Sequence, residues 1–308
     1  MLRNTRMLLL GSASIFMFSS AGATTCSCAN VPLLGSLEPA TPEPGKWLLS
    51  STFEYHDISD LVSGSSSIND ATGRDRTAKA MIVEVSKSLP GKVSISLLLS
   101  AIQHDREIGS AHDSASGLGD AIVMARYSPK SISLYSRNAL SFGIGSRLPI
   151  GESDASSGGI VYAEDLQPST GAFAVIGWAY AARSLNDSSS ARLYSTLSYT
   201  YNYDNDRNYR FGHELAGSIG MSYQTQTPWG FSMDVVYRQG RRDERSDVSI
   251  PNTGGDWVDV VPAIQYHINE NMAFRASAKL PVYRDLNDQL QFTTKHAARL
   301  TFSYTFGR

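Results

Sequence analysis

The chain has 308 residues, a formal net charge of −2 and 42 % hydrophobic residues. This charge gives no general electrostatic case for nucleic acid, and after the N-terminus no stretch approaches the roughly 20 apolar residues of a membrane helix. Only 18 % of the residues are charged, whereas Tyr (15) and Gly (25) are frequent. This composition favours a transmembrane β-barrel over a cytoplasmic enzyme.

The N-terminus has the pattern of a secretory signal peptide. Arg3 and Arg6 form a basic region, Met7 to Phe18 an apolar core, and Ala21-Gly22-Ala23 a small-residue cleavage site. About twelve apolar residues are too few to cross a bilayer as a helix. We therefore expect residues 1–23 to be a cleaved signal peptide that exports the chain.

Cys26 and Cys28 are the only cysteines, and they follow this cleavage site. Neither is the first mature residue, as a lipoprotein requires, and the Cys-x-Cys spacing is poor for a disulfide, whose Cα atoms lie about 4.4–6.8 Å apart. Two ligands do not make a metal site, so both are weak metal candidates, and we expect no cofactor. Residues 24–45 contain several prolines and no period, which predicts a segment in the periplasm or in the barrel mouth.

Apolar and polar residues alternate almost without a break from residue 46 onward. Because successive strand side chains point to opposite faces, each run predicts a strand with one apolar and one polar face. The predicted strands cover residues 46–55, 77–89, 92–103, 120–127, 138–148, 171–182, 191–203, 212–226, 231–239, 257–268, 272–280 and 297–306. Their lengths suit a tilted membrane strand of roughly 9–11 residues.

The connections alternate between long and short. Tight turns follow the second, eighth and tenth strands, and the longest polar loops are 56–76, 149–170 and 240–256. Long loops on one side and short turns on the other are typical of outer-membrane barrels, whereas the loops of a soluble sandwich need not follow this rhythm.

The last run decides the fold class. Its apolar face consists of Ala298, Leu300, Phe302, Tyr304 and Phe306. An aromatic strand at the chain terminus is expected to pair with the first strand and remove both sheet edges. We predict an all-β fold: a transmembrane antiparallel up-and-down β-barrel of about 12 strands over residues 46–308, with both termini in the periplasm.

Glycines within the strands have two interpretations. Barrels use glycine where the wall bends or where another group approaches closely, and local curvature is the simpler interpretation here. The residues concerned are Gly143, Gly145, Gly177, Gly217 and Gly220.

Charged residues on the polar strand faces are predicted to line the interior, because a midplane Arg or Lys facing lipid costs about 2–4 kcal/mol. These residues are Arg126, Arg147, Arg192, Glu214, Asp234, Arg238, Asp259, His267, Arg275, Lys279 and Arg299. One interpretation, which we favour, is a paired ionic network that braces the wall. The other is a basic, anion-favouring passage, since basic groups outnumber acidic ones in this set.

The sequence contains no catalytic constellation. The six histidines are scattered, and Gly-x-Ser-x-Gly, His-Glu-x-x-His and glycine-rich phosphate loops are absent. The nearest pair for a barrel hydrolase is His213 with Ser218 or Ser222, and its spacing carries no signal. We therefore expect a protein that is not an enzyme.

Three segments in order resemble a known family. Ser116-Gly117-Leu118-Gly119-Asp120 precedes a strand that ends Ala125-Arg126-Tyr127, residues 143–151 read Gly-Ile-Gly-Ser-Arg-Leu-Pro-Ile-Gly, and Leu166-Gln167-Pro168-Ser169-Thr170-Gly171 follows. This order is similar to the outer-membrane transporter-like proteins named for the meta-pathway of phenol degradation. The match covers mainly residues 116–180, and Pro149-Ile150-Gly151 departs from the usual Pro-Thr-Gly. The resemblance implies a barrel that passes hydrophobic or aromatic compounds, and it supplies no ligand residues.

The expected function is passive uptake or efflux of small solutes across the outer membrane of a Gram-negative cell. The expected partners are outer-membrane lipids, lipopolysaccharide, the barrel-assembly machinery and the solute itself, with no nucleic acid. The alternatives are a structural or interaction barrel with a plugged bore that displays its long loops, and an anion-favouring porin. An outer-membrane hydrolase is a third, weaker hypothesis.

Overall fold

The computed structural model describes residues 45–131, 137–186 and 190–307. The predicted signal peptide, nearly all of segment 24–45, and both Cys26 and Cys28 lie outside these residues. Within the described ranges, no helix is long and apolar enough to cross a membrane.

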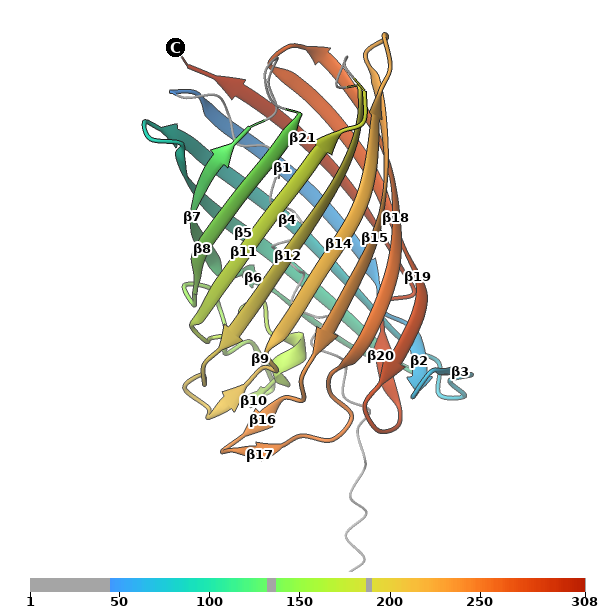
Figure 1. Cartoon of the computed structure of the whole chain (residues 1–308). Helices are drawn as coiled ribbons and strands as arrows, with labels where there is room; N and C mark the ends of the chain where they lie inside the picture. The colour runs from blue at the N-terminus through green and yellow to red at the C-terminus, as the bar shows by residue number, and fades with distance from the viewer. Residues whose placement is uncertain (1–44, 132–136, 187–189, 308) are drawn as a thin grey trace, which may run out of the picture.

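Twelve strands form one closed antiparallel sheet (Figure 1). Its order is β4-β1-β21-β19-β18-β15-β14-β12-β11-β8-β7-β5, and pairing of β4 with β5 closes the ring. The strands are β1 (Trp47–Asp57), β4 (Arg74–Leu89), β5 (Val93–Ile108), β7 (Ala121–Lys130), β8 (Asn138–Leu148), β11 (Ala174–Ser184), β12 (Ala191–Asn202), β14 (Glu214–Gln224), β15 (Trp229–Gly240), β18 (Gly255–Asn269), β19 (Met272–Leu286) and β21 (His296–Phe306). The predicted twelve-stranded barrel is confirmed.

The long connections gather at one end of the barrel, the bottom of Figure 1, which we call the long-loop end; the C-terminus lies at the other, the short-turn end. The sequence predicts only loops there, but the structure adds short strands and one turn of 3₁₀-helix. They are β2 (Asp60–Ser63), β3 (Ser66–Ile68), β6 (Ala111–Leu118), β9 (Ser156–Ser157), β10 (Ile160–Val161), η3 (Glu164–Leu166), β13 (Tyr209–Arg210), β16 (Glu244–Arg245), β17 (Val248–Ser249) and β20 (Gln291–Thr293). Their polar residues lack the alternation that identifies a membrane strand.

Strands β4, β5 and β19 run further than predicted, into this end. β4 and β5 pair from Arg74↔Ile108 to Leu89↔Val93, the longest ladder of the barrel. The outer part of β5 then pairs with β6 on its other edge, so that β7 pairs with β5 only from Val93↔Tyr127 to Leu98↔Ile122.

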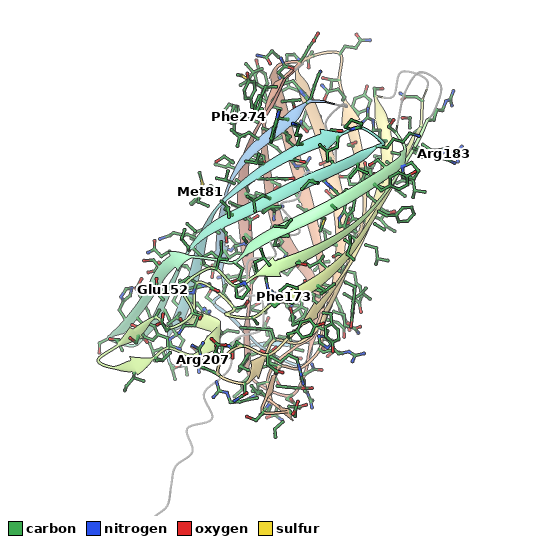
Figure 2. The ribbon with its side chains drawn as sticks, turned by 90° about the vertical axis from the view of Figure 1, so that its left-hand side faces the viewer. Met81, Glu152, Phe173, Arg183, Arg207 and Phe274 are labelled. Atoms are coloured by element: carbon green, nitrogen blue, oxygen red, sulfur yellow. The ribbon has the colours of Figure 1, made fainter. Side chains whose placement is uncertain are left out.

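Strand side chains alternate between the two faces of the wall. In β5, Ile95, Leu97 and Leu99 are exposed on the outside, while the residues between them are buried on the inner face. Figure 2 shows Met81 and Phe274 projecting outward in the same way. The outer surface is therefore apolar.

Aromatic side chains flank this apolar band at both of its ends. The short-turn end carries Trp47, Tyr127, Tyr223, Trp229, Tyr266 and Phe306, and the long-loop end carries Phe173, Tyr199, Tyr201, Tyr203, Tyr237 and Tyr283. An apolar band between two aromatic girdles is the outer surface of an outer-membrane barrel, because aromatic rings favour the membrane–water interface.

The first and last strands meet as the sequence predicts. β1 pairs with β21 from Trp47↔Phe306 to Asp57↔His296. The rings of Trp47 and Phe306 stack with centroids 6.5 Å apart, and the hydroxyls of Thr52 and Thr301 lie 3.0 Å apart on the inner face. This seam joins the first and last strands of the barrel and leaves it without a sheet edge.

We expect Phe306→Asp to block or strongly slow barrel assembly, because it places a charge at the closing seam and removes the Trp47 stack. Phe231→Asp is the matched control, since Phe231 is similarly exposed on the outer surface but lies in the middle of the chain. The measurement is heat-modifiable migration and protease resistance of the membrane fraction. Equal assembly of the two variants would show that Phe306 has no special role in closure.

Candidate functional site

The predicted interior residues occupy the polar face of the wall. Arg126, Asp234, Arg238 and Asp259 are buried. Arg147, Glu214, His267, Arg275, Lys279 and Arg299 are half-buried, whereas Arg192 is exposed near the start of β12. The strands β7, β8, β12, β14, β15, β18, β19 and β21 position them, so the set is distributed along the wall and does not form one cluster.

Most of these charges are paired across strands. The ion pairs are Arg126–Glu84 (3.4 Å), Arg147–Asp120 (3.5 Å), Arg238–Glu214 (3.2 Å), Arg275–Asp234 (3.8 Å), Lys279–Asp259 (3.1 Å) and Arg299–Glu54 (2.5 Å). Among the described residues, Arg192 and His267 have no ion pair. Each basic group that has a partner faces a different carboxylate, so the network carries little net charge.

Three of the carboxylates are missing from the predicted set. Glu54 and Glu84 lie on the polar faces of β1 and β4, where the same alternation rule would have found them. Asp120 begins the predicted strand 120–127 and lies on the same face as Arg126, so the rule would have found it as well. The predicted excess of basic groups is a consequence of these omissions and not of the molecule.

Arg126 is the most enclosed member of the network. Its Nη2 donates to the hydroxyls of Ser86 and Ser96, at 3.2 and 2.8 Å, and to Glu84. Its guanidinium lies 5.8 Å from the Trp178 ring centroid. A charge buried this deeply depends on its partners, because an uncompensated charge in a low-dielectric surrounding is costly.

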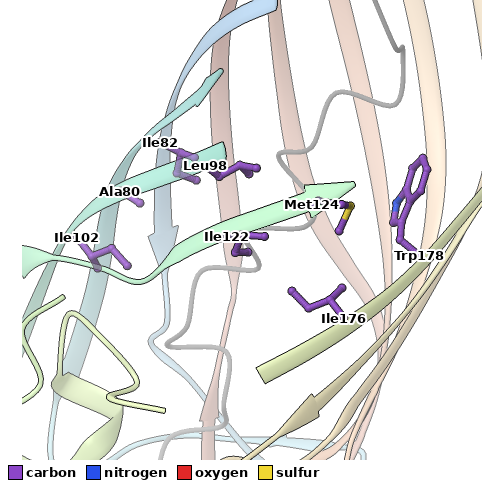
Figure 3. Packing of buried hydrophobic residues seen from close by; sticks show 8 residues of the cluster. All are labelled: Ala80, Ile82, Leu98, Ile102, Ile122, Met124, Ile176 and Trp178. Atoms are coloured by element: carbon purple, nitrogen blue, oxygen red, sulfur yellow. The ribbon is translucent and has the colours of Figure 1, made fainter. Parts of the chain in front are cut away.

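The inner face also carries an apolar patch, which the sequence does not predict (Figure 3). It is formed by β4, β5, β7 and β11, and its members are Ala80, Ile82, Leu98, Ile102, Ile122, Met124, Ile176 and Trp178. In β5, Leu98 and Ile102 share a face with serines and are buried, while Leu97 and Leu99 face outward. Assigning every apolar side chain to the lipid side is therefore wrong on this part of the wall.

An aromatic row continues the patch onto β11 and β12. Trp178 stacks on Tyr180 with centroids 6.0 Å apart, and Tyr180 lies 6.5 Å from Tyr194. Glycines opposite these rings make room for them. A Cβ atom on Gly143 would lie 3.3 Å from the Trp178 ring, and one on Gly220 would lie 2.6 Å from the Tyr194 ring.

The strand glycines therefore differ in their role. At Gly145 and Gly220 a neighbouring group approaches too closely for a side chain, and at Gly143 the fit would be tight, so close approach favours glycine at these positions. A Cβ atom on Gly177 would meet no other described residue within 4 Å, and one on Gly217 would make only ordinary contacts. At these two positions, space does not require glycine.

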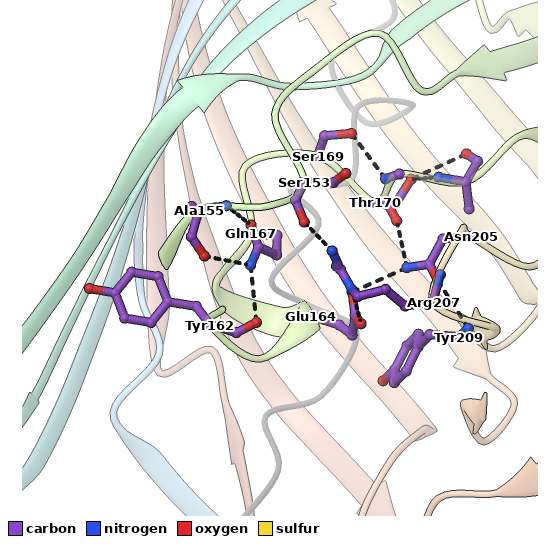
Figure 4. Close-up of polar contacts among 12 residues, drawn as sticks. Ser153, Ala155, Tyr162, Glu164, Gln167, Ser169, Thr170, Asn205, Arg207 and Tyr209 are labelled. Carbon is purple, nitrogen blue, oxygen red and sulfur yellow. Dashed lines mark hydrogen bonds and ion pairs between the residues drawn. The ribbon is translucent and has the colours of Figure 1, made fainter. Parts of the chain in front are cut away.

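The loop 149–170 is held at the barrel mouth by charged anchors from other segments (Figure 4). The Glu164 carboxylate accepts hydrogen bonds from Arg207, which also donates to the carbonyl of Ser153, and from Asn205 at 3.2 Å. Arg76, on the inner face of β4, forms an ion pair of 2.6 Å with Asp165. The loop therefore turns toward the interior and narrows the long-loop end.

Further polar contacts hold the middle and the C-terminal end of this loop. Asp120 accepts hydrogen bonds from the hydroxyls of Ser169 and Thr170, and the Gln167 amide forms hydrogen bonds with the backbone of residues 155 and 162.

The hydrogen bonds to Glu164 raise the pKa of Arg207. On a neighbouring loop, burial and the Asp243 carboxylate raise the pKa of Tyr209, whose hydroxyl donates to that carboxylate.

The structure does not assemble the hydrolase pair. His213 stacks on Tyr201 at 4.2 Å, and its Nδ1 accepts from the backbone N–H of Asn202. The Ser218 hydroxyl is instead bonded to that of Thr196 at 2.7 Å. In the described parts of the chain, no group of three or more His, Cys, Asp or Glu side chains is arranged to hold a metal ion.

No protein-family model and no curated protein sequence matches the chain. Among solved structures, it is similar to an outer-membrane channel from Pseudomonas putida F1, at 11 % identity over 87 % of this chain and 97 % of that chain, with a TM-score of 0.71. It also resembles the KdgM porin, at 9 % identity over 84 % of this chain and 99 % of that chain, with a TM-score of 0.48. A third similar structure is the CymD monoaromatic hydrocarbon channel, at 8 % identity over 86 % of this chain and 89 % of that chain, with a TM-score of 0.44.

These similarities concern the fold alone, and only the first is close enough to carry an argument. The chain has the fold of an outer-membrane β-barrel. Its closed ring, its apolar band and its two girdles, described above, lead to the same class.

Gly220→Ala should destabilise the barrel, because the added methyl group collides with Asp234 Oδ1 and with the Tyr194 ring. We expect a loss of about 1–3 kcal/mol, the usual cost of overpacking. Gly177→Ala is the control at an open position and should change stability by less than about 0.5 kcal/mol. Urea unfolding in detergent or lipid measures both, and equal effects would contradict a space requirement at Gly220.

Arg126→Met should be strongly destabilising, by about 3–5 kcal/mol, because it leaves the buried Glu84 without its cation. The double variant Glu84→Gln/Arg126→Met should recover much of this loss, since it removes both charges. Arg192→Gln, at the exposed and unpaired position, should have little effect. Urea unfolding in detergent or lipid measures the stability of all three variants. An Arg126→Met variant as stable as Arg192→Gln would contradict the structural role of the Arg126–Glu84 pair.

Proposed function

We propose that this protein is an outer-membrane channel through which small, weakly polar solutes diffuse, and that it is related to the transporter-like proteins of the phenol meta-pathway. In this proposal residues 1–23 direct export, the barrel-assembly machinery inserts the barrel among lipids and lipopolysaccharide, and the long-loop end faces outward. The eleven predicted interior residues line the passage or brace its wall. The protein has no enzymatic role.

The observation that carries this proposal is the pairing of the interior charges. An anion-favouring passage needs cations without partners, but six of the predicted basic residues each face a carboxylate, and Arg76 faces Asp165. The charges therefore suit a brace between strands, which was the interpretation favoured from the sequence.

The inner apolar patch supports the class of solute. On this side the inner wall combines paired charges with an apolar layer that includes Leu98, Ile122 and Trp178, a surrounding that suits apolar or aromatic groups better than ions. The similarity in fold to an outer-membrane channel agrees with a role in passage. The anchored loop 149–170 supports a narrow mouth, so a plugged barrel that only displays loops is the competing function.

Two measurements test the proposal. In planar bilayers with an asymmetric salt gradient, we expect low conductance and a reversal potential close to zero. In cells that produce the protein, an apolar fluorescent probe should cross the outer membrane faster than in cells without it. Ile122→Asn should slow this entry several-fold by making the inner patch polar, whereas Arg275→Ala should leave it unchanged.

Glu54→Gln adds a positive control for charge pairing. It removes the carboxylate that faces Arg299, so any ion current should shift toward anions relative to the wild type. Asp247→Asn, on an exposed loop, should leave the reversal potential unaltered. Strong anion selectivity in the wild type that disappears in Arg275→Ala or Arg299→Ala would defeat the proposal, and absence of both conductance and probe entry would favour the plugged barrel.

A further inference from the structure

Two buried histidines lie in one row across the inner wall. His56 on β1 and His104 on β5 are both opposite Ala78 of the intervening β4. The strand on the far side of each histidine also carries an alanine at this level, because His56 pairs with Ala297 and His104 pairs with Ala115. The Cα atoms of the two histidines are thus two strand spacings apart, about 10 Å along the sheet. Both side chains point from the curved wall to the interior, and every cross-strand position beside them carries only a methyl group.

Three ring nitrogens in this row have no hydrogen-bond partner among the described residues. They are Nδ1 of His56 and both Nδ1 and Nε2 of His104, although the two residues are only 4 % and 0 % exposed. Buried polar atoms of proteins are rarely left without a partner, and each exception calls for an explanation such as a ligand or an ordered water. An unused donor and unused acceptors are therefore concentrated at one place on the wall.

The hydrogen bond from His56 to Glu54 fixes what this place can recognise. Nε2 of His56 lies 3.1 Å from the Glu54 carboxylate, which can only accept, so the proton of the neutral ring is on Nε2 and Nδ1 presents a lone pair. Neutral His104 offers one further N–H and one further lone pair. A bound group must therefore donate as well as accept, which a hydroxyl does and a carboxylate does not.

The surroundings of the row suit an uncharged molecule. The charges nearest along the strands are already paired, as Glu54 with Arg299 and Arg76 with Asp165. Apolar groups lie on both sides of the row: Ala80 and Ile102 of the inner apolar patch toward the middle of the barrel, and Ile58, Leu61 and Phe292 around Ala78 toward the long-loop end. A solute with an apolar body and one hydroxyl can satisfy both features.

We propose that His56 and His104 form a binding site for the hydroxyl group of an otherwise apolar, uncharged solute. The site rests on the proposed function, because such a solute reaches it only by entering the barrel. In the bound state the hydroxyl donates to a ring lone pair and accepts from the His104 N–H. The apolar body lies against the alanines of the row and the neighbouring apolar patch.

The experiment uses the mature protein in detergent micelles, with its histidine rings labelled with ¹⁵N, at a pH about one unit above the ordinary imidazole pKa of roughly 6.5. The ring nitrogens are observed by NMR during titration with cyclohexanol, cyclohexanone and cyclohexanecarboxylate, which share a ring and differ in the polar group. We expect saturable shifts at His56 and His104 with cyclohexanol, weaker binding of the ketone and none of the carboxylate. His112, His213, His267 and His296 serve as internal controls.

Variants separate the site from a general effect of the solute. His104→Phe keeps a flat ring without nitrogens and should weaken cyclohexanol binding, followed at His56, by about tenfold, the factor for roughly one hydrogen bond. His104→Gln retains a donor and an acceptor and should bind more tightly than His104→Phe. His112→Phe, at an exposed position of β6, should bind like the wild type. Heat-modifiable migration identifies the variants that are folded.

Several outcomes overturn the site. No probe-dependent shift at His56 or His104 means that water satisfies these nitrogens, and equal binding of carboxylate and alcohol removes the hydroxyl preference. Unchanged binding in both folded His104 variants also refutes the site. If the probe enters cells but the ring nitrogens of His56 and His104 do not shift, the site is refuted and the proposed function stands. If these nitrogens shift but the probe does not enter cells, passage is refuted and the site stands.

Discussion

A bilayer interior offers no hydrogen-bond partner to a backbone, and this constraint determines the architecture. A sheet satisfies it only when its edges are paired, so the chain must return to its beginning. The pairing of β1 with β21 meets that requirement. Closure in turn creates an outer face that tolerates only apolar side chains and an inner face that lipid does not contact, and the inner face is therefore free to carry charges, small apolar groups and histidines.

The charges on the inner face are neutralised by partners on adjacent or nearby strands. Each pair, such as Lys279–Asp259 on adjacent strands, neutralises its own part of the wall. Because the charges cancel pair by pair, the wall can hold many ionic groups without producing a field of one sign along the axis. The apolar patch and the aromatic row occupy the remaining area on the β4–β5–β7–β11 side, next to the Arg126–Glu84 pair.

Alternation predicted the strands well because a side-chain period of two is imposed on every membrane strand by the lipid on one side. It assigned Arg299 and Asp259 to the inner face for the same reason. It could not orient Ile176, because both faces of the predicted strand 171–182 are apolar, whereas Leu98 shares its face with Ser96 and Ser100, so the same rule places it inside. Asp165 lies in the loop 149–170, where the direction of a side chain depends on tertiary contacts such as the ion pair with Arg76, and no local signal indicates it.

The order of the strands has a kinetic consequence. Around the ring, every pair of neighbours follows directly in the chain except β1 with β21. The β4–β5 hairpin, with its long ladder, needs only a short turn to form, and each later strand can add to the edge of a growing sheet. A single non-local step then remains, and its entropic cost rises only with the logarithm of the loop length. The chain can therefore zip outward from the β4–β5 hairpin, with ring closure as the final and slowest event.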